Sequence, residues 1–304
     1  MGQCLTEYMA DKTNGLPMDL GLEGIVVLDK DCSVLYEKRW VDDYPRDIYS
    51  NTKSFTSAAI GMAIHEGYLD LKDKPTDFFG DNHRTYDGSW EKMTLSDLLT
   101  MRSGILGPQL MYFDRRAGIG ARDYVAHMMS QVMAFAPGEK YAYSTGDSIL
   151  AGCMLEKACR TSLLSFLYDR YFEPMGIEYP IWETDLCGHT CGGSGLCLRL
   201  VDMAKLGVLY LNKGVAGGRR LFSASWAQES FHAHVQTNNS FFSWTYGYYW
   251  KGSKDSRVVR ASGSFGQDTL VFPSLGLVLG MQCRPGTNAS HCMYGIIKDY
   301  LDNL

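Results

Sequence analysis

Apolar runs mark strands at both ends of the chain. Residues 23–29 centre on the run GIVVLD, and residues 33–40 alternate as SVLYEKRW, with a turn-like Asp-Lys-Asp between them. Two such runs joined by a short polar turn predict a β-hairpin. Aromatic and β-branched residues return near the C-terminus, where we predict strands at 244–250, 257–261, 267–273 and 276–283.

The middle of the chain carries helical periodicity instead. Apolar positions between Phe55 and Ala63 follow the 3.6-residue period, which predicts a helix that begins near Ser50 and stops at Gly67. Further helices are predicted at 94–101, 145–158, 200–212 and 289–301.

Strands at both ends with helices between them predict an α+β fold, an α/β sandwich with one antiparallel sheet built from both termini and flanked by helices. On this interpretation residues 1–67 and 201–304 form the sheet domain, and residues 68–200 form a mostly helical insertion. An active site is expected at the interface between the two.

Composition and charge narrow the possible partners. The chain has 304 residues, is 45% hydrophobic and carries a net charge of −5, which favours neither nucleic acid nor an anionic membrane as a partner. No apolar stretch reaches the 18 residues of a spanning helix, and the start lacks the basic and apolar pattern of a secretory signal. We therefore expect a cytoplasmic location.

The nine cysteines are an odd number and are scattered, so we expect reduced thiols rather than a disulfide framework. Four potential metal ligands crowd together at Cys187, His189, Cys191 and Cys197. Their spacing lacks the paired C-x-x-C form of structural zinc sites. We expect no metal and no other cofactor.

Ser50 and Lys53 are the first candidates for chemistry. Three residues apart on a helix, they share one face, with Cβ atoms roughly 5–6 Å apart. A serine hydroxyl needs a base to become a nucleophile, and a lysine can be that base where burial lowers its pKa. Because serine at a helix start is also a common N-cap, this pair alone is weak evidence for catalysis.

Two later segments offer partners. Residues 137–146, PGEKYAYSTG, form a predicted loop in which Tyr143 could share the base role with a lysine. Residues 260–267, RASGSFGQ, lie between two predicted strands, where the N–H of Ser264 could stabilise an oxyanion. Taken singly, each also fits an ordinary loop aromatic or hairpin turn.

Together and in this order, the three segments resemble the serine β-lactamase and penicillin-binding superfamily, and most closely class C β-lactamases and their esterase relatives. The resemblance covers the chain from about Gly24 to the C-terminus. Further segments that match the family's usual order are SNTKSFTSAAIGMAIHEGYLDLKD, LSDLLTMRSGI, PGEKYAYSTGDSILAG, GGSGLCLRLVDMAKLG and YGYYW.

The resemblance implies a β-lactamase/transpeptidase-like fold and a role for each matching residue. Ser50 would be acylated, with Lys53 as base and Tyr143 as its partner. The N–H groups of Ser264 and Ser50 would bind the oxyanion. The residues expected to bind substrate are Thr145, Ala261, Ser262, Gly263, Trp244 and Phe265.

Two departures from the family pattern bear on substrate. Tyr-x-Asn reads Tyr143-Ser144-Thr145, which replaces an amide by a hydroxyl, and Lys-Thr-Gly begins with Ala261, which removes a cation. In the family the amide holds substrate and the lysine helps to hold a carboxylate, so we expect weak hydrolysis of penicillins. Arg260 is a poor replacement, since strand alternation points it to the face opposite Ala261.

The favoured function is therefore a serine hydrolase that acts through an acyl-enzyme on a small ester, amide or peptide-like substrate. A true β-lactamase or D-amino-acid peptidase is the alternative, and a non-catalytic ligand-binding relative is a third hypothesis from another class. The intact Ser50, Lys53 and Tyr143 favour catalysis. An α/β-hydrolase is excluded because no Gly-x-Ser-x-Gly elbow is present. The sequence leaves the oligomeric state open.

Overall fold

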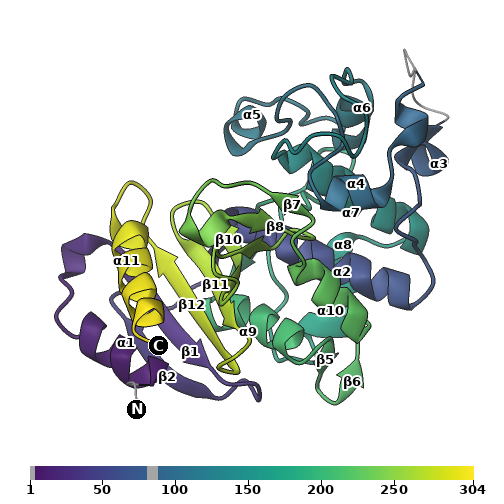
Figure 1. Cartoon of the computed structure of the whole chain (residues 1–304). Coiled ribbons are helices and arrows are strands. Elements are labelled where there is room, and N and C mark those ends of the chain that lie inside the picture. The colour runs from purple at the N-terminus through teal and green to yellow at the C-terminus, as the bar shows by residue number, and fades with distance from the viewer. Residues whose placement is uncertain (1–3, 81–87) are drawn as a thin grey trace.

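The computed structural model describes residues 4–80 and 88–304 (Figure 1). Within these residues the main sheet has eight strands, paired antiparallel in the order β2-β1-β12-β11-β10-β9-β8-β7. The prediction of one antiparallel sheet built from both ends of the chain is confirmed. Its longer strands are β2 (Val34–Arg39), β1 (Leu22–Leu28), β12 (Leu277–Cys283), β11 (Gln267–Phe272) and β10 (Val259–Gly263).

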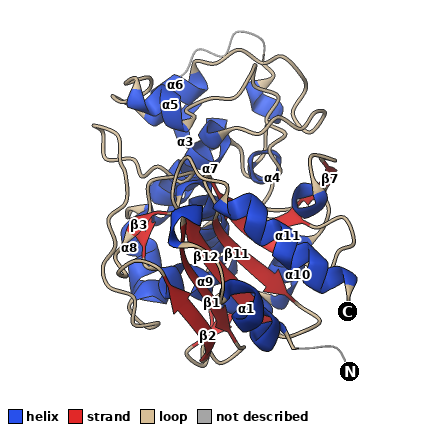
Figure 2. Cartoon of the chain, turned by 90° about the vertical axis from the view of Figure 1, so that its left-hand side faces the viewer, coloured by secondary structure: helices blue, strands red, loops and turns tan. Residues whose placement is uncertain are grey.

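The sheet separates two hydrophobic clusters. Along β1, Val26 belongs to one cluster and Val27 to the other, because successive side chains of a strand point to opposite faces. On the face of Val27 the sheet is covered by α1 (Leu5–Thr13) and α11 (Ala289–Asp302), which pack together (Figure 2). The described N-terminus and the C-terminus lie close together on this side.

On the other face α9 (Leu200–Leu211) lies directly against the sheet. Glycines make the approach possible. A Cβ on Gly207 would lie 2.7 Å from Val278 Cγ1, and a Cβ on Gly280 would lie 2.8 Å from Ala204 Cβ. Both distances are shorter than atoms tolerate, so the helix and the sheet meet through positions without side chains.

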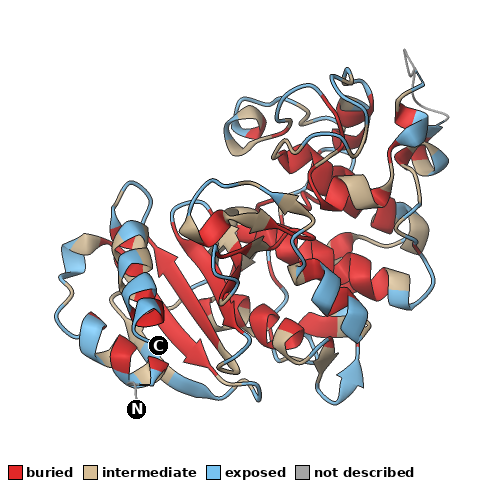
Figure 3. Ribbon diagram, viewed as in Figure 1, coloured by how far each residue is buried: buried red, intermediate tan, exposed pale blue. Residues whose placement is uncertain are grey.

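The helix predicted after Ser50 is α2 (Thr52–His65), and every residue from 52 to 63 is buried (Figure 3). A helix buried on all sides belongs to the interior of the fold. It packs against α7 (Thr145–Cys159) and α8 (Leu163–Leu167). Beyond α7 lies a group of short helices, α3 (Pro75–Phe79), α4 (Leu95–Leu99), α5 (Tyr112–Arg116) and α6 (Tyr124–Met129).

One hydrophobic cluster runs from the sheet through α2 into the short helices, so α2 joins the two parts of the fold. The domain boundaries at residues 67 and 201 stay a prediction. No helix in the described ranges is both long and apolar enough to span a bilayer. All nine cysteines are free thiols.

One local prediction is wrong, and one helix was missed. Residues 244–250 do not form one strand: β8 (Thr245–Tyr246) ends in a tight turn, in which Gly247 N donates to Trp250 O, and β9 (Lys251–Gly252) follows. The aromatic run fills the core from this turn instead of extending the sheet. The N-terminal helix α1 was not predicted, because its apolar residues become recognisable only against α11.

The remaining described strands and α-helix are short. They are β7 (Val235–Gln236), α10 (Ala224–Phe231), the pair β3 (Arg46–Asp47) with β4 (Cys197–Leu198), and the pair β5 (Val215–Ala216) with β6 (Arg219–Arg220).

Two helical glycines give a matched test of the packing between α9 and the sheet. Gly207→Ala should lower the free energy of unfolding by about 1–3 kcal/mol, because the new methyl group collides with Val278 and Thr269. Gly295→Ala in α11 meets nothing within 4 Å and should raise it by up to about 1 kcal/mol through helix propensity. Urea unfolding of both variants measures the difference, and equal stabilisation by both would contradict the close packing.

Candidate active site

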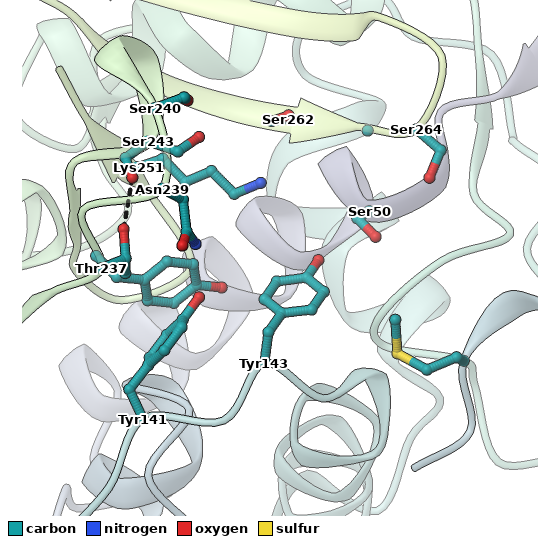
Figure 4. A pocket seen from close by; sticks show the side chains of 13 residues that line it. Ser50, Tyr141, Tyr143, Thr237, Asn239, Ser240, Ser243, Lys251, Ser262 and Ser264 are labelled. Atoms are coloured by element: carbon teal, nitrogen blue, oxygen red, sulfur yellow. Dashed lines mark hydrogen bonds between the residues drawn. The ribbon is translucent and has the colours of Figure 1, made fainter. Parts of the chain in front are cut away.

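Ser50 lies in a single 3-10 turn, Tyr49–Asn51, immediately before α2 (Figure 4). The residue before it, Tyr49, has a φ of +48°, a conformation that is strained for a residue with a side chain. Tyr49 N donates to Asp47 Oδ1 at 2.7 Å and so fixes the turn. The turn exposes the Ser50 side chain to a cavity on the surface of the protein.

Lys53 meets Ser50 as the spacing predicted. Its Nζ donates to Ser50 Oγ at 3.1 Å, to Thr145 Oγ1 at 3.2 Å and to Gly193 O at 2.8 Å. The side chain is only 1% exposed. Burial, the largest influence, lowers the pKa of Lys53 to about 7, and the nearby charges of Arg115 and Asp147 act in opposite directions. A substantial neutral fraction can therefore accept a proton near neutral pH.

Gly193 is a site residue that the sequence did not reveal. A Cβ at this position would overlap Ser148 Oγ and Thr145 Cγ2, so only glycine lets the loop bring its carbonyl onto the Lys53 ammonium. Thr56 Oγ1 holds the preceding residue by donating to Gly192 O at 2.6 Å. The glycine-rich run was visible in the sequence, but nothing there linked it to Lys53.

Tyr143 lies in the loop before α7, beside the Ser–Lys pair. Lys53 Nζ is 5.0 Å from the centroid of its ring. Figure 4 shows the phenolic hydroxyl directed toward the Ser50 side chain. Thr145, two residues later, is 2% exposed and contacts Lys53 rather than the cavity. Thr145, which stands where the family has asparagine, thus helps to hold Lys53 in place.

The end of β10 lies beside the nucleophile. Ser262, Gly263 and Ser264 all line the cavity with Ser50. A Cβ on Gly263 would overlap Ile48 O, so glycine allows the strand to reach the turn before Ser50. The strand end and Ser50 therefore line the same cavity, where an oxyanion site would need backbone N–H groups.

Asn51 binds the turn that carries Ser50 to the sheet. Its Nδ2 donates to Gln267 O at 3.0 Å and to Ala261 O at 3.4 Å. Both acceptors lie on the strand pair β10–β11, and the amide is fully buried. The position of Ser50 relative to the strand is therefore set by buried hydrogen bonds.

The cavity has a volume of about 440 Å³ and mixes aromatic and hydroxyl groups. Two of the residues expected to bind substrate, Trp244 and Phe265, lie outside its lining. Trp244 lies under the Lys254 ammonium, and Phe265 packs edge-on against Tyr49 at 5.2 Å. The aromatic and apolar lining comes from Tyr141, Tyr246 and Met111, together with Tyr143.

The missing family lysine leaves a neutral position, since Ala261 is fully buried and outside the lining. Arg260 does point away: its guanidinium donates to Phe242 O and Ser243 Oγ and pairs with Asp268. A different cation, Lys251 of β9, extends into the cavity (Figure 4). In the sequence, Lys251 stands directly after the aromatic run 244–250, which is predicted as a strand, and nothing there marks it as a site residue.

One group of side chains has metal-ligating potential. Single ligand atoms of Asp123, Asp185 and His189 lie within 4.8 Å of one another. The Asp185 carboxylate already accepts hydrogen bonds from Tyr124 N, Cys187 N, His189 N and His189 Nδ1. These hydrogen bonds account for the cluster as a stabilisation of the loop, and none of its three residues lines the cavity beside Ser50.

Comparison with known proteins agrees with this geometry. A family model described as Beta-lactamase matches residues 23–284. The chain belongs to the beta-lactamase family. The turn, helix and strand that hold Ser50, Lys53 and Ser264 all lie within the matched region, and the fold is that of class C-like serine β-lactamases and esterases.

Individual relatives of this family member are distant. Protein flp of Staphylococcus aureus (strain MW2) is 27% identical over 139 residues, which is 45% of this chain and only 28% of that protein. The hydrolase EstCE1, described as having promiscuous acyltransferase activity, superposes with a TM-score of 0.75 at 16% identity, covering 97% of this chain and 99% of its own. A family VIII carboxylesterase superposes at 0.68 with 15% identity and the same coverage. At these identities the superpositions show the fold alone.

The buried lysine predicts a specific pH dependence of stability. Lys53 has a pKa of about 7 when folded, against an ordinary value of 10.5, so between these pH values the unfolded chain binds one more proton. The free energy of unfolding of the wild type, minus that of Lys53→Met, should therefore rise with pH between 7 and 10, by up to about 1.4 kcal/mol per pH unit. Urea titrations at several pH values measure it. A difference independent of pH would show that the ammonium stays charged in the fold.

Proposed function

We propose that this beta-lactamase family member is a serine hydrolase that cleaves a small ester or amide through an acyl-enzyme on Ser50. The observation that carries the proposal is the 3.1 Å hydrogen bond between Ser50 Oγ and the Nζ of a buried lysine whose pKa is lowered to about 7. A cavity beside this pair gives a substrate carbonyl access to the serine.

In the first half-reaction neutral Lys53 takes the proton of Ser50 as its Oγ attacks the substrate carbonyl carbon. The carbonyl oxygen becomes an oxyanion, held by the backbone N–H groups of Ser50 and Ser264. When the tetrahedral intermediate collapses, the bond to the leaving group breaks. The leaving group receives the proton from Lys53, directly or by way of Tyr143, and the acyl group remains on Ser50.

In the second half-reaction water attacks the acyl-enzyme. The Lys53–Tyr143 pair takes a proton from the water, and a second oxyanion forms in the same site. Its collapse breaks the ester bond, returns the proton to Ser50 Oγ and releases the acid. The same residues thus serve both halves, as reversible proton transfer requires.

The two other hypotheses stand differently against the structure. A non-catalytic relative would have no need of a buried lysine directed at a serine, because a buried amine without an ion-pair partner destabilises the fold. A true β-lactamase or D-amino-acid peptidase remains the second candidate. The specific observation in its favour is Lys251, which restores a cation to a cavity where the sequence predicted none.

Acylation gives the direct test of Ser50. Intact-mass measurement after exposure to a fluorophosphonate should show one adduct, and Ser50→Ala should lose both the adduct and at least about a thousandfold in kcat/KM for p-nitrophenyl esters. Ser225→Ala removes an exposed serine of α10 and serves as the matched control. Wild-type turnover by Ser50→Ala would exclude the proposed nucleophile. The same measurement with β-lactams, and kcat/KM for nitrocefin, separates the second candidate.

Lys53 and Tyr143 should act as one unit. Because both serve the same proton transfer, Lys53→Met, Tyr143→Phe and the double variant should each lower kcat by a similar factor. Steady-state kinetics with p-nitrophenyl acetate and circular dichroism of each folded variant measure this. If the loss in the double variant equals the product of the two single losses, the residues work independently.

A further inference from the structure

The cavity beside Ser50 contains one lysine side chain without a counter-ion. Among its described lining residues only Lys251 carries a formal charge. The Lys251 ammonium has neither an ion pair nor a hydrogen bond with any residue in the described ranges, and its contact is with the face of the Tyr143 ring, at 5.5 Å from the centroid. Figure 4 shows the side chain extended, with its nitrogen inside the cavity.

The charges around Lys251 leave this ammonium unsatisfied. Asp268 is the carboxylate whose charge raises the pKa of Lys251. However, Asp268 is fully buried and already bound to Arg260 and Tyr294. Arg260, and Lys53 when it is protonated, add positive charge nearby. Burial lowers the pKa of Lys251, because the charged ammonium is less stable here than in water. An anion bound in the cavity would stabilise the charged ammonium.

Neutral donors stand beside the ammonium. Ser243 Oγ accepts a hydrogen bond from Arg260 Nη2 at 2.8 Å, so its own proton is free to be donated into the cavity. The amide of Asn239 and the hydroxyl of Ser262 also line the cavity and make no hydrogen bond with another described residue. A carboxylate can accept several hydrogen bonds at once, and such charge-assisted bonds are the strong ones.

The Tyr143 ring lies close to both Lys251 and Lys53. Lys251 Nζ and Lys53 Nζ lie 5.5 Å and 5.0 Å from the centroid of Tyr143. A compact substrate can therefore place its scissile carbonyl at Ser50 and an anionic group at Lys251.

We propose that Lys251, with Ser243, Asn239 and Ser262, forms an anion-binding subsite, and that the substrate is an ester or amide that carries a carboxylate a few bonds from the bond that is cleaved. This inference rests on the proposed hydrolase function. It assigns selectivity to a residue of β9, whereas the resemblance placed the family cation at position 261 of β10.

Matched pairs of neutral and anionic esters test the subsite. One pair, p-nitrophenyl pentanoate and p-nitrophenyl hemiglutarate, differs in charge on the acyl side. The other, the acetyl esters of methyl 4-hydroxybenzoate and of 4-hydroxybenzoate, differs on the leaving-group side. After subtraction of the rates in buffer alone, wild-type kcat/KM should favour the anionic member of at least one pair by about ten- to a hundredfold, the value of one charge-assisted hydrogen bond. The pair that shows the preference identifies the side.

Three substitutions assign the preference to its source. Lys251→Met keeps the length of the side chain and removes the charge, so the anionic-to-neutral ratio should fall at least tenfold. Lys251→Arg should retain the ratio. Lys254→Met removes an exposed lysine from the same hairpin and should leave the ratio as in the wild type. No preference in either pair, or a preference that survives Lys251→Met, overturns the subsite.

A binding measurement keeps the subsite testable apart from turnover. In Ser50→Ala protein, isothermal titration with glutarate should show binding that weakens at least tenfold when Lys251→Met is added. Absence of glutarate binding overturns the subsite even if esters are hydrolysed. Glutarate binding without any ester turnover or fluorophosphonate adduct in the wild type would instead overturn the hydrolase function and leave the subsite standing.

Discussion

The site depends on keeping one lysine out of water. Lys53 is 1% exposed, and the acceptors of its ammonium are neutral: a serine, a threonine and a backbone carbonyl. A buried ammonium without a carboxylate partner is costly, and the protein lowers the cost by releasing the proton. In the proposed mechanism this neutral form accepts the proton of Ser50. The same desolvation that penalises the fold therefore produces the neutral amine, and burial of the large core around α2 offsets that penalty.

The geometry around this lysine is fixed from two sides. From the sheet, Asn51 binds the backbone of β10 and β11, and Gly263 lets the strand touch the turn that carries Ser50. From the helical side, Thr145 at the start of α7 and the carbonyl of Gly193 hold the ammonium. Residues from both parts of the chain thus converge on one hydrogen-bonded group. A shift between the parts would change the Ser–Lys distance directly, which makes their shared core a requirement of the chemistry.

The sequence predicted what depends on local pattern, and missed what depends on contact between distant segments. The Ser-x-x-Lys spacing determines its own geometry on a helix, and the apolar runs of β1 and β12 are long enough to indicate central strands. Gly193 serves Lys53 only through a loop 140 residues away in sequence. The sequence favours Trp244 as a substrate contact because it is aromatic and precedes the segment 260–267, yet in the fold it packs under Lys254 and lies outside the cavity lining.

The cation of the cavity shows why a motif is an incomplete guide to a site. Strand β10 carries a neutral, fully buried Ala261 at the position of the family lysine. The guanidinium of the neighbouring Arg260 is already bound to Ser243, Asp268 and Tyr294. Because strands of a sheet lie about 4.8 Å apart, a long side chain on β9 can reach much of the space that one on β10 would occupy. Lys251 does so and lies over Tyr143. Its charge therefore enters the cavity from the side of residues 237–251, so a bound anion would sit above the phenol ring rather than along β10. With the proposed subsite, the orientation of a substrate would be set by Lys251 of β9, a strand of two residues that hydrophobic periodicity does not reveal.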